Sequence, residues 1–303
     1  MRFNVNFNGA QSSSLIEGVI NEAGSNSVIN INTAQALSTN ELVSIADIAG
    51  NKALGFQFNG AQASTSMIEQ VLSEAGGNTS VTVNTAQSKS TSDLVSIANT
   101  AGNKALSFIF NGAQSSKSEI EQVLSAAGSN TSVTINTAQA FSVSDLTSIA
   151  NAAGSNKLNF QFNGAQASTS MIEQVLSASG SNTSISINTA QAKSTSDLVS
   201  IANTAGDKSL TFIFNGAQSS KSEIEQVLSA AGSNTTVTIT SSEYISTNDL
   251  VSIANSAGTK SAEFRGQYTH LSNLSGSGNE IGILSPYFPD PEHPNLTFMP
   301  SFK

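Results

Sequence analysis

A glycine recurs every 26 residues through most of this 303-residue chain. The positions are Gly24, Gly50, Gly76, Gly102, Gly128, Gly154, Gly180, Gly206, Gly232 and Gly258. A fixed period of this length is the signature of a repeat array, in which each repeat packs against its neighbours. A residue without a Cβ commonly ends a helix in the left-handed conformation, so we expect each glycine to terminate a helix.

A serine with an acid three residues later precedes each expected helix. Five pairs are Ser14 and Glu17, Ser66 and Glu69, Ser118 and Glu121, Ser170 and Glu173, and Ser222 and Glu225. Five more are Ser38 and Glu41, Ser90 and Asp93, Ser142 and Asp145, Ser194 and Asp197, and Ser246 and Asp249. This spacing is that of a capping box, and the acid also complements the helix dipole. We therefore predict about ten helices of roughly three turns and assign the acids to helix starts.

Between each glycine and the next helix lies a segment with a period of two, which predicts a strand. Odd repeats carry FQFNGAQ or FIFNGAQ, and even repeats carry VTVNTAQ or related sequences. In one odd strand, Phe108 and Phe110 point one way while Ile109 and Asn111 point the other. The similarity of Asn51–Gly102 to residues 155–206 also indicates a duplicated block of 104 residues.

Alternating strands and helices imply parallel strands joined by right-handed crossovers. A doubly wound sheet would have continuous apolar strands, and an eight-fold barrel would fill its interior with aliphatic side chains. Here the second strand face carries Asn, Thr and Gln. With helices on one side only, strands about 4.8 Å apart and helices about 8–10 Å apart require curvature. The predicted fold class is α/β: a right-handed βα solenoid, or horseshoe, of ten strand–helix repeats of 26 residues. Its parallel sheet forms the concave face and its helices the convex face.

This pattern resembles the leucine-rich-repeat horseshoe, most of all the ribonuclease-inhibitor-like class, which also alternates two repeat types. The family strand pattern LxxLxLxxN/C places Ala105, Phe108 and Phe110 at leucine positions and Ala113 at the Asn/Cys position. Phe, Val, Ile and Ala replace most of the leucines, so the resemblance is architectural and covers residues 2–266. It implies a scaffold that binds macromolecules, and bacterial effectors with similar repeats carry such scaffolds into host cells.

The sequence changes character after the array. We predict a repeat array over residues 1–266 and a C-terminal extension over residues 267–303, which holds all five prolines and both histidines. The extension is predicted to cap the apolar end of the array, with a tail carrying an export or partner motif as the alternative. At the other end, Arg2 and the asparagines Asn4, Asn6 and Asn8 are predicted to blunt the first strand against pairing, with an edge open for self-association or a partner as the alternative.

The chain is acidic, with a net charge of −9 from 21 acidic and 12 basic residues. Its lysines are spread singly, which argues against a nucleic acid or an anionic membrane as partner. It has no cysteine and no apolar run of the roughly 18–20 residues that a membrane span needs. We expect it in the cytoplasm, or exported to a host cytosol by a signal that the sequence does not reveal.

A row of asparagines ends the predicted strands on the uncovered face. It comprises Asn8, Asn32, Asn59, Asn84, Asn111, Asn136, Asn163, Asn188 and Asn215. One interpretation is that the row forms a surface of amide donors and acceptors that binds a protein, with a glycan as the less favoured partner. The alternative is a ladder that stitches neighbouring strands together and ends each strand before its turn.

A second candidate site lies where the repeat breaks down, at Glu243, Tyr244, Glu263 and Arg265. No nucleophile elbow, P-loop or HExxH motif occurs, and no cofactor or metal is expected. The predicted function is a non-enzymatic scaffold that binds a macromolecule, most plausibly a protein, on its concave face. The alternatives are a structural module that self-assembles through its first strand, or an enzyme that uses His270 or His293 in the extension.

Overall fold

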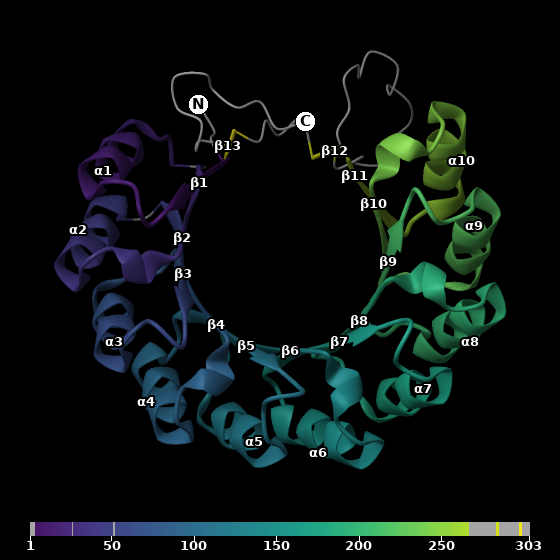
Figure 1. Ribbon diagram of the computed structural model, residues 1–303, viewed down its shortest axis with the longest axis horizontal. Helices are drawn as coiled ribbons and strands as arrows, with labels where there is room; N and C mark the ends of the chain where they lie inside the picture. Colours follow the sequence, from purple (N-terminus) through teal and green to yellow (C-terminus); the bar gives the residue numbers. More distant parts are fainter. Residues whose placement is uncertain (1–3, 26, 51, 267–282, 285–296, 299–303) are drawn as a thin grey trace. The chain divides into compact units, whose positions relative to one another are not determined.

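The computed structural model of the chain describes residues 4–25, 27–50, 52–266, 283–284 and 297–298. It comprises two compact units. Of the described residues, the N-terminal unit contains 4–25, 27–50, 52–135, 155–158 and 297–298, and the C-terminal unit contains 136–154, 159–266 and 283–284. Both are built from the same alternation of strand and helix (Figure 1).

The N-terminal unit holds the first half of the repeats. Its strands are β1 (Asn4–Asn8), β2 (Val28–Asn32), β3 (Ala53–Asn59), β4 (Thr79–Asn84), β5 (Ala105–Asn111) and β6 (Thr131–Asn136). Its helices are α1 (Ser13–Glu22), α2 (Thr39–Ala49), α3 (Thr65–Glu74), α4 (Thr91–Ala101) and α5 (Lys117–Ala126). Strands β1 to β5 pair in parallel in sequence order.

The C-terminal unit repeats this plan. Its helices are α6 (Val143–Ala153), α7 (Thr169–Ala178), α8 (Thr195–Ala205), α9 (Lys221–Ala230) and α10 (Thr247–Ala257). Its strands are β7 (Lys157–Asn163), β8 (Thr183–Asn188), β9 (Leu210–Asn215), β10 (Thr235–Thr240) and β11 (Ser261–Arg265), of which β8 to β11 pair in parallel. Short 3-10 turns follow the even strands: η1 (Ala34–Ala36), η2 (Ala86–Ser88), η3 (Ala138–Ala140), η4 (Ala190–Ala192) and η5 (Ser242–Tyr244).

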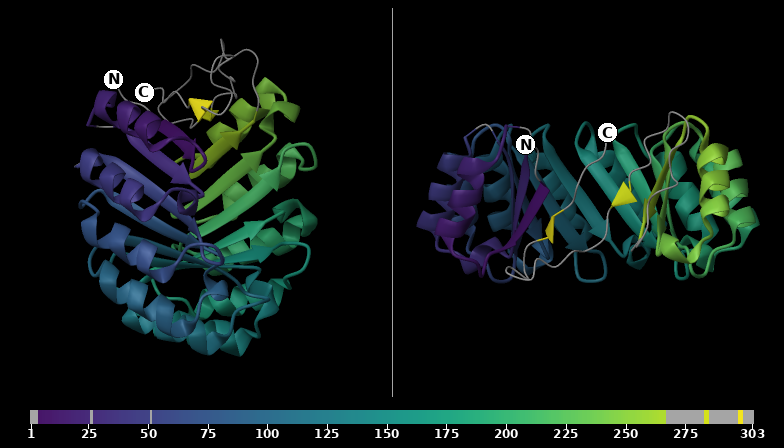
Figure 2. Two further views of the ribbon diagram at one scale, coloured as in Figure 1. Left: turned by 60° about the vertical axis from the view of Figure 1, so that its left-hand side comes forward. Right: turned by 90° about the horizontal axis from the view of Figure 1, so that it is seen from above.

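In each unit the helices cover one face of a curved parallel sheet (Figures 1 and 2). The alternating strand pattern explains this. In β3, Phe56 and Phe58 are fully buried against the helices while Gln57 and Asn59 are half-buried on the other face. The two rings lie 6.3 Å apart, and each odd strand from β3 to β9 carries such a pair. The predicted α/β class, with strands on the concave side and helices on the convex side, is confirmed.

The even helices begin as predicted. Ser38 is the N-cap of α2, and its hydroxyl accepts from the Glu41 N–H while its own N–H donates to the Glu41 carboxylate at 2.9 Å. Ser90, Ser142, Ser194 and Ser246 occupy the same position before α4, α6, α8 and α10. Each of these four serines accepts from the N–H of the Asp three residues on, which satisfies an otherwise unpaired donor at the helix start. Its hydroxyl also donates to the carboxylate of the same Asp.

The predicted caps of the odd helices are wrong by two residues. The N-caps are Ser12, Ser64, Ser116, Ser168 and Ser220, so Ser14 and its counterparts Ser66, Ser118, Ser170 and Ser222 lie inside the first turn. The glutamates expected to close these caps have another role. Glu17 accepts a hydrogen bond from Ser44 on the next helix at 2.9 Å, and Glu69, Glu173 and Glu225 accept from Ser96, Ser200 and Ser252. A bond between helices therefore replaces the local capping box.

The glycine prediction holds for only half of the set. Gly50, Gly102, Gly154, Gly206 and Gly258 follow the even helices with φ between 53° and 59°. Among the described glycines, those after the odd helices do not have positive φ. Three of them lack space for a side chain: a Cβ on Gly76, Gly128 or Gly232 would lie 2.6, 1.9 or 1.8 Å from the carbonyl oxygen of Gly50, Gly102 or Gly206. A Cβ on Gly180 would meet nothing within 4 Å.

At four of the five odd helices, a lysine from the next odd repeat caps the C-terminus by donating to its carbonyl groups. The Lys104 ammonium donates to the carbonyls of Leu72 and Ser73 at the end of α3, and Lys52, Lys208 and Lys260 do the same for α1, α7 and α9. Asn156 takes this place for α5, with its amide nitrogen 2.8 Å from the Leu124 carbonyl. A cation at this end complements the helix dipole and satisfies carbonyls without a partner in the helix.

We expect Lys104→Met to destabilise the protein by about 1–2 kcal/mol, because it removes a charged donor from helix-end carbonyls. The urea midpoint, followed by circular dichroism, measures the effect. Lys117→Met is the matched control, since the Lys117 ammonium only reaches Glu121 across the surface at 3.6 Å and such pairs contribute about 0.3–0.5 kcal/mol. Equal shifts in the two variants would contradict the assigned role of Lys104.

Burial raises the pKa of Glu223 in the first turn of α9, against a smaller opposing effect of the Ser220 backbone N–H. A raised pKa means that the charged carboxylate costs stability at neutral pH and that this cost disappears as the group is protonated. We therefore expect Glu223→Gln to melt at a higher temperature than the parent at pH 7. The difference should vanish below about pH 4. Thermal unfolding at both pH values tests this, and a difference that persists in acid would refute it.

Candidate functional site

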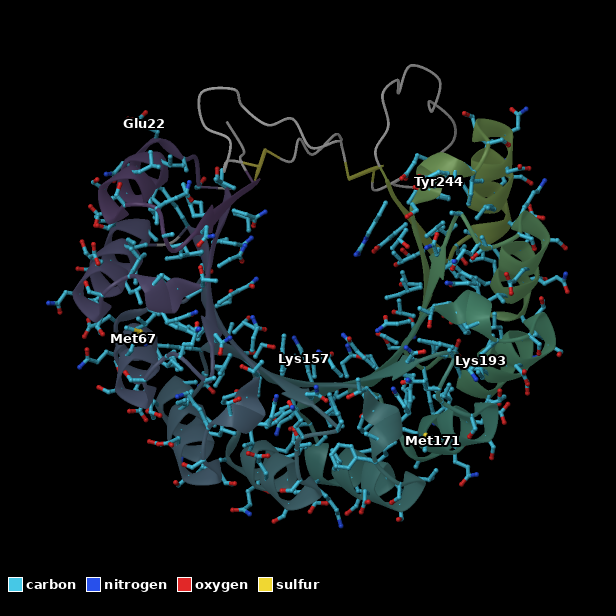
Figure 3. All side chains as sticks on the ribbon, in the orientation of Figure 1. Glu22, Met67, Lys157, Met171, Lys193 and Tyr244 are labelled. Atoms are coloured by element: carbon cyan, nitrogen blue, oxygen red, sulfur yellow. The ribbon has the colours of Figure 1, made fainter. Side chains whose placement is uncertain are left out.

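The concave face of each unit is formed by strand side chains that point away from the helices, and the two faces, which have the same kinds of side chain, are described together (Figure 3). Among the described strand residues, the charged ones are Lys157, Glu263 and Arg265. Glu263 and Arg265 pair with each other at 2.8 Å, which leaves Lys157 at the start of β7 as an exposed single charge. The rest of this face consists of Asn, Gln, Ser and Thr with few apolar residues, so it is polar but almost neutral.

The predicted asparagine row lies on this face. The members Asn59, Asn84, Asn111, Asn136, Asn163, Asn188 and Asn215 are each the last residue of a strand, and all are half-buried. The register places Asn59 directly beside Asn84 and Asn8 beside Asn32. The asparagines that end odd-numbered strands and those that end even-numbered strands lie in different environments. We call them the odd asparagines and the even asparagines, and the even ones are Asn32, Asn84, Asn136 and Asn188.

The odd asparagines, Asn8, Asn59, Asn111, Asn163 and Asn215, hold the chain reversal after their strands. The side-chain oxygen of Asn59 accepts from the Ala61 N–H at 2.9 Å, and the other four accept from the N–H two residues on. This is an Asx turn. The Asn59 oxygen also accepts from the Thr85 hydroxyl in the next repeat at 3.2 Å. The odd asparagines therefore serve the fold, as the alternative interpretation expected.

The residue that follows each even strand has an unusual backbone. Thr33, Thr85, Thr137, Thr189 and Ser241 have φ between 51° and 53°, a left-handed conformation that β-branched residues rarely adopt. The following contacts explain why it persists. The Gly60 N–H donates to the Asn84 carbonyl at 2.7 Å, and a Cβ on Gly60 would lie 2.7 Å from the Thr85 carbonyl oxygen. The Asn-Gly pair thus fits where two backbones approach closely.

Glutamines complete the connection between repeats, and sequence reasoning missed them. The Gln35 side-chain oxygen accepts from the Asn59 N–H at 3.0 Å, and its amide nitrogen donates to Gln62 at 2.9 Å. Gln87, Gln139 and Gln191 repeat both bonds. The available signal was the constant Gln in every TAQ and GAQ segment.

The even asparagines behave differently. Within the part of the chain that the structure describes, the side-chain amides of Asn32, Asn84 and Asn188 take part in no hydrogen bond with other protein groups. The side-chain oxygen of Asn136 is buried without a partner. An amide offers two donors and an acceptor, so the even asparagines are the members of the row with hydrogen-bonding capacity left over.

Of the four residues of the C-terminal corner, the structure brings Glu263 and Arg265 into contact. Glu263 accepts from Arg265 at 2.8 Å and from the Thr238 hydroxyl at 3.2 Å, so this pair is engaged within the chain. The Glu243 carboxylate fills the space beside Gly266, where a Cβ would lie 2.1 Å from it. Tyr244 stands out because it is 72% exposed, at a position where other repeats have Ala or Ser (Figure 3).

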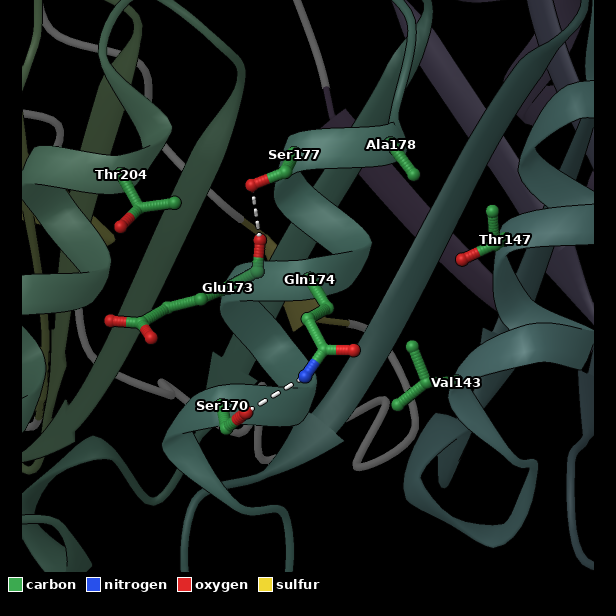
Figure 4. A pocket seen from close by; sticks show the side chains of 8 residues that line it. All are labelled: Val143, Thr147, Ser170, Glu173, Gln174, Ser177, Ala178 and Thr204. Atoms are coloured by element: carbon green, nitrogen blue, oxygen red, sulfur yellow. Dashed lines mark hydrogen bonds between the residues drawn. The ribbon is translucent and has the colours of Figure 1, made fainter.

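The convex face carries shallow grooves between helices. The groove over α6, α7 and α8 is shown in Figure 4, and it is lined by Val143, Thr147, Ser170, Glu173, Gln174, Ser177, Ala178 and Thr204. Its polar groups are used locally: Gln174 donates to Ser170, and Ser177 donates to the Glu173 carbonyl, both at 2.8 Å. It presents no grouping of acid, base and nucleophile.

In the part of the chain that the structure describes, no three His, Cys, Asp or Glu side chains gather as a metal would require. None of the helices in that part is both long and apolar enough to cross a membrane. The histidines proposed for an enzyme, His270 and His293, lie outside the described residues.

Comparison with known proteins supports the architecture. No protein-family model matches the sequence, and no curated protein matches it. Among solved structures, the chain is similar to the leucine-rich repeat-containing protein LegL7 from Legionella pneumophila, with a TM-score of 0.61 and 14% identity. That alignment covers 84% of this chain and 91% of LegL7. The fold is leucine-rich-repeat-like.

A second similar structure is the Rad7 and Elc1 complex of yeast, with a TM-score of 0.46 and 10% identity over 90% of this chain and 77% of the other. This likeness is too distant to add to the argument. The similarity to LegL7 concerns the fold alone, because the two sequences share so few residues.

We expect the odd asparagines to resist deamidation in the folded chain. In this reaction the glycine nitrogen attacks the Asn side-chain carbon, ammonia leaves, and water opens the ring to aspartate or isoaspartate. Here the Gly164 N–H donates to the Asn188 carbonyl and the Asn163 oxygen is held by two donors. We expect deamidation at pH 8.5 to be at least about tenfold slower in buffer than in urea, because it requires local opening.

Asn215 should deamidate fastest of the set in the folded state. Ser241 replaces the threonine there, and among the described interactions the Asn215 oxygen receives only the Ala217 N–H. Trypsin releases Asn163 and Asn215 in different peptides, 158–193 and 209–221, so mass spectrometry resolves them. Ser241→Thr is the matched variant, and it should slow the deamidation of Asn215 without changing that of Asn163. Equal rates in folded and unfolded chains would contradict the assigned structural role.

Proposed function

We propose that this protein is a protein-binding scaffold whose partner docks on the concave strand face. One observation carries the proposal. The regular polar side chains described above are largely used by the fold, whereas the amides of Asn32, Asn84 and Asn188 remain available on an uncovered surface. Amides that receive no partner within the chain are suited to pair with donors and acceptors of another molecule.

The chemistry of the face favours a protein partner. The even asparagines are accompanied by small hydroxyl side chains, including Thr82 on β4, and by half-buried Ile109 and Ile213 on β5 and β9. A protein interface combines such apolar positions with about one hydrogen bond per 100–200 Å². Because the face is almost neutral, binding should depend little on ionic strength.

An effector role, with delivery into a host cell, remains a prediction based on resemblance. LegL7 comes from Legionella pneumophila, and its similarity to this chain concerns the fold. The scaffold proposal does not depend on where the protein acts. It depends on the even asparagines, and its test is directed at them.

The test compares three forms of the full chain as bait for affinity capture with quantitative mass spectrometry. The first is the parent, and the second carries Asn32→Asp, Asn84→Asp and Asn188→Asp on the concave face. The third is a control of equal charge with Ser73→Asp, Ser125→Asp and Ser177→Asp, which lie exposed on convex helices.

We expect the parent and the control to capture the same protein. The amount captured by the concave variant should be at least about tenfold lower, because a mismatched polar group at an interface costs about 1–3 kcal/mol. Retention should survive 0.5 M salt. A partner lost only from the convex control, or retained by all three forms, would place the binding surface elsewhere.

A further inference from the structure

Both outermost repeat strands are paired with short segments of the C-terminal extension. In the N-terminal unit, β13 (Thr297–Phe298) runs antiparallel to β1, with Phe298 opposite Val5 and Thr297 opposite Asn6. In the C-terminal unit, β12 (Ile283–Leu284) runs parallel to β11, with Ile283 beside Phe264 and Leu284 beside Arg265. Neither segment belongs to the 26-residue repeat.

Strand β1 needs such cover more than an ordinary edge strand does. An uncovered edge presents a row of N–H and C=O groups that can pair with another chain, and proteins usually blunt it with charge, proline or a bulge. The sequence of β1 is NVNFN, without charge or proline. Val5 and Phe7 are 1% and 0% exposed, so β1 is an integral part of the core and cannot move aside.

The sequence around β13 is suited to cover a strand of this length. Prolines at 294 and 300 confine any strand to the residues between them, because proline cannot donate to a ladder. That interval is Asn295–Met299, with sequence NLTFM, and it equals β1 in length at five residues. Thr and Phe favour strands, and the flanking prolines discourage the addition of a further strand.

We propose that β12 and β13 together form an intramolecular edge cap. Its segments 283–284 and 297–298 occupy the outer edges of β11 and β1 and so exclude a second copy of the chain from those edges. The second copy is the competitor to exclude, because its own β1 and β11 would present edges of the same kind wherever β13 or β12 is displaced. The cap concerns the edges of the sheets and not their concave faces, so this proposal does not depend on the proposed function.

A disulfide test examines the pairing of β13 with β1 in the full chain. The chain has no cysteine, so Asn6→Cys with Thr297→Cys introduces the only two thiols. Directly paired residues in an antiparallel ladder have Cα atoms about 4.5–5.5 Å apart, within reach of a disulfide. The control combines Asn6→Cys with Ile283→Cys, because Ile283 pairs with Phe264 on β11 and not with β1.

We expect mild oxidation to give a disulfide-linked monomer from the first pair and much less from the control. This is read from non-reducing gel mobility and confirmed by peptide mapping. Disulfide-linked dimers would show that the segment covers another copy's edge, and absence of cross-linking would show that it covers none. Either of these results would overturn the intramolecular cap.

A second test removes the pairing and measures association. The full chain with Thr297→Pro and Phe298→Pro cannot donate from either residue to β1, and Ser277→Pro in the glycine-rich stretch of the extension is the control. We expect amide exchange in Asn4–Asn8 to accelerate at least about tenfold in the double variant, with protection in β8 and β9 retained as evidence that the array is folded.

Sedimentation velocity should then show association that increases with concentration in the double variant, while the parent and the control stay monomeric. The proposal is overturned if the double variant exchanges and sediments like the parent. It is also overturned if the parent itself associates through its edges, because the cap would then exclude nothing.

Discussion

The difference in spacing between strands and helices governs this protein. Parallel strands lie about 4.8 Å apart, whereas packed helices need about 8–10 Å. With one helix for every strand and all helices on one face, each unit must bend so that the helices occupy the longer arc. That bend leaves the second strand face uncovered. The uncovered face is where any large binding surface must be sought, and its side chains must tolerate water without losing strand register.

The odd and even repeats solve this problem in different ways. An odd asparagine closes its turn and holds a threonine of the next repeat, while a glutamine of the preceding repeat satisfies its N–H. The even asparagines join these contacts through their backbone carbonyls, while the side-chain amides of Asn32, Asn84 and Asn188 take no part among the described residues. The left-handed threonines carry a cost on the order of 1–2 kcal/mol each, which the surrounding hydrogen bonds and packed core offset. Stability is thus concentrated at the odd turns, and the even strand ends are left with unused amides.

Much of the fold was predictable, because period and alternation are local signals. The strand faces, the even caps at Ser38 and its equivalents, and the concave position of the asparagines all followed from spacing along one repeat. The errors share a cause. Glu17 bonds to Ser44 and Lys104 bonds to Leu72, partners 27 and 32 residues away. A motif such as Ser-x-x-Glu cannot distinguish a local cap from a bond to the neighbouring helix. For the same reason the sequence placed the asparagines in one row and did not separate its two halves.

The lysine contact at the odd helix ends has a consequence for how such a gene can change length. Lys52 reaches α1 and Lys104 reaches α3, so each contact begins in one odd repeat and ends in the odd repeat before it. Loss or gain of one 26-residue repeat would join two repeats of the same type and leave a helix end and a turn without their partners. Heritable length variation should therefore proceed in steps of 52 residues, and the duplicated block of 104 residues is two such steps. Because the repeat types alternate, recombination can add or remove only whole pairs of repeats without reducing the stability of the fold.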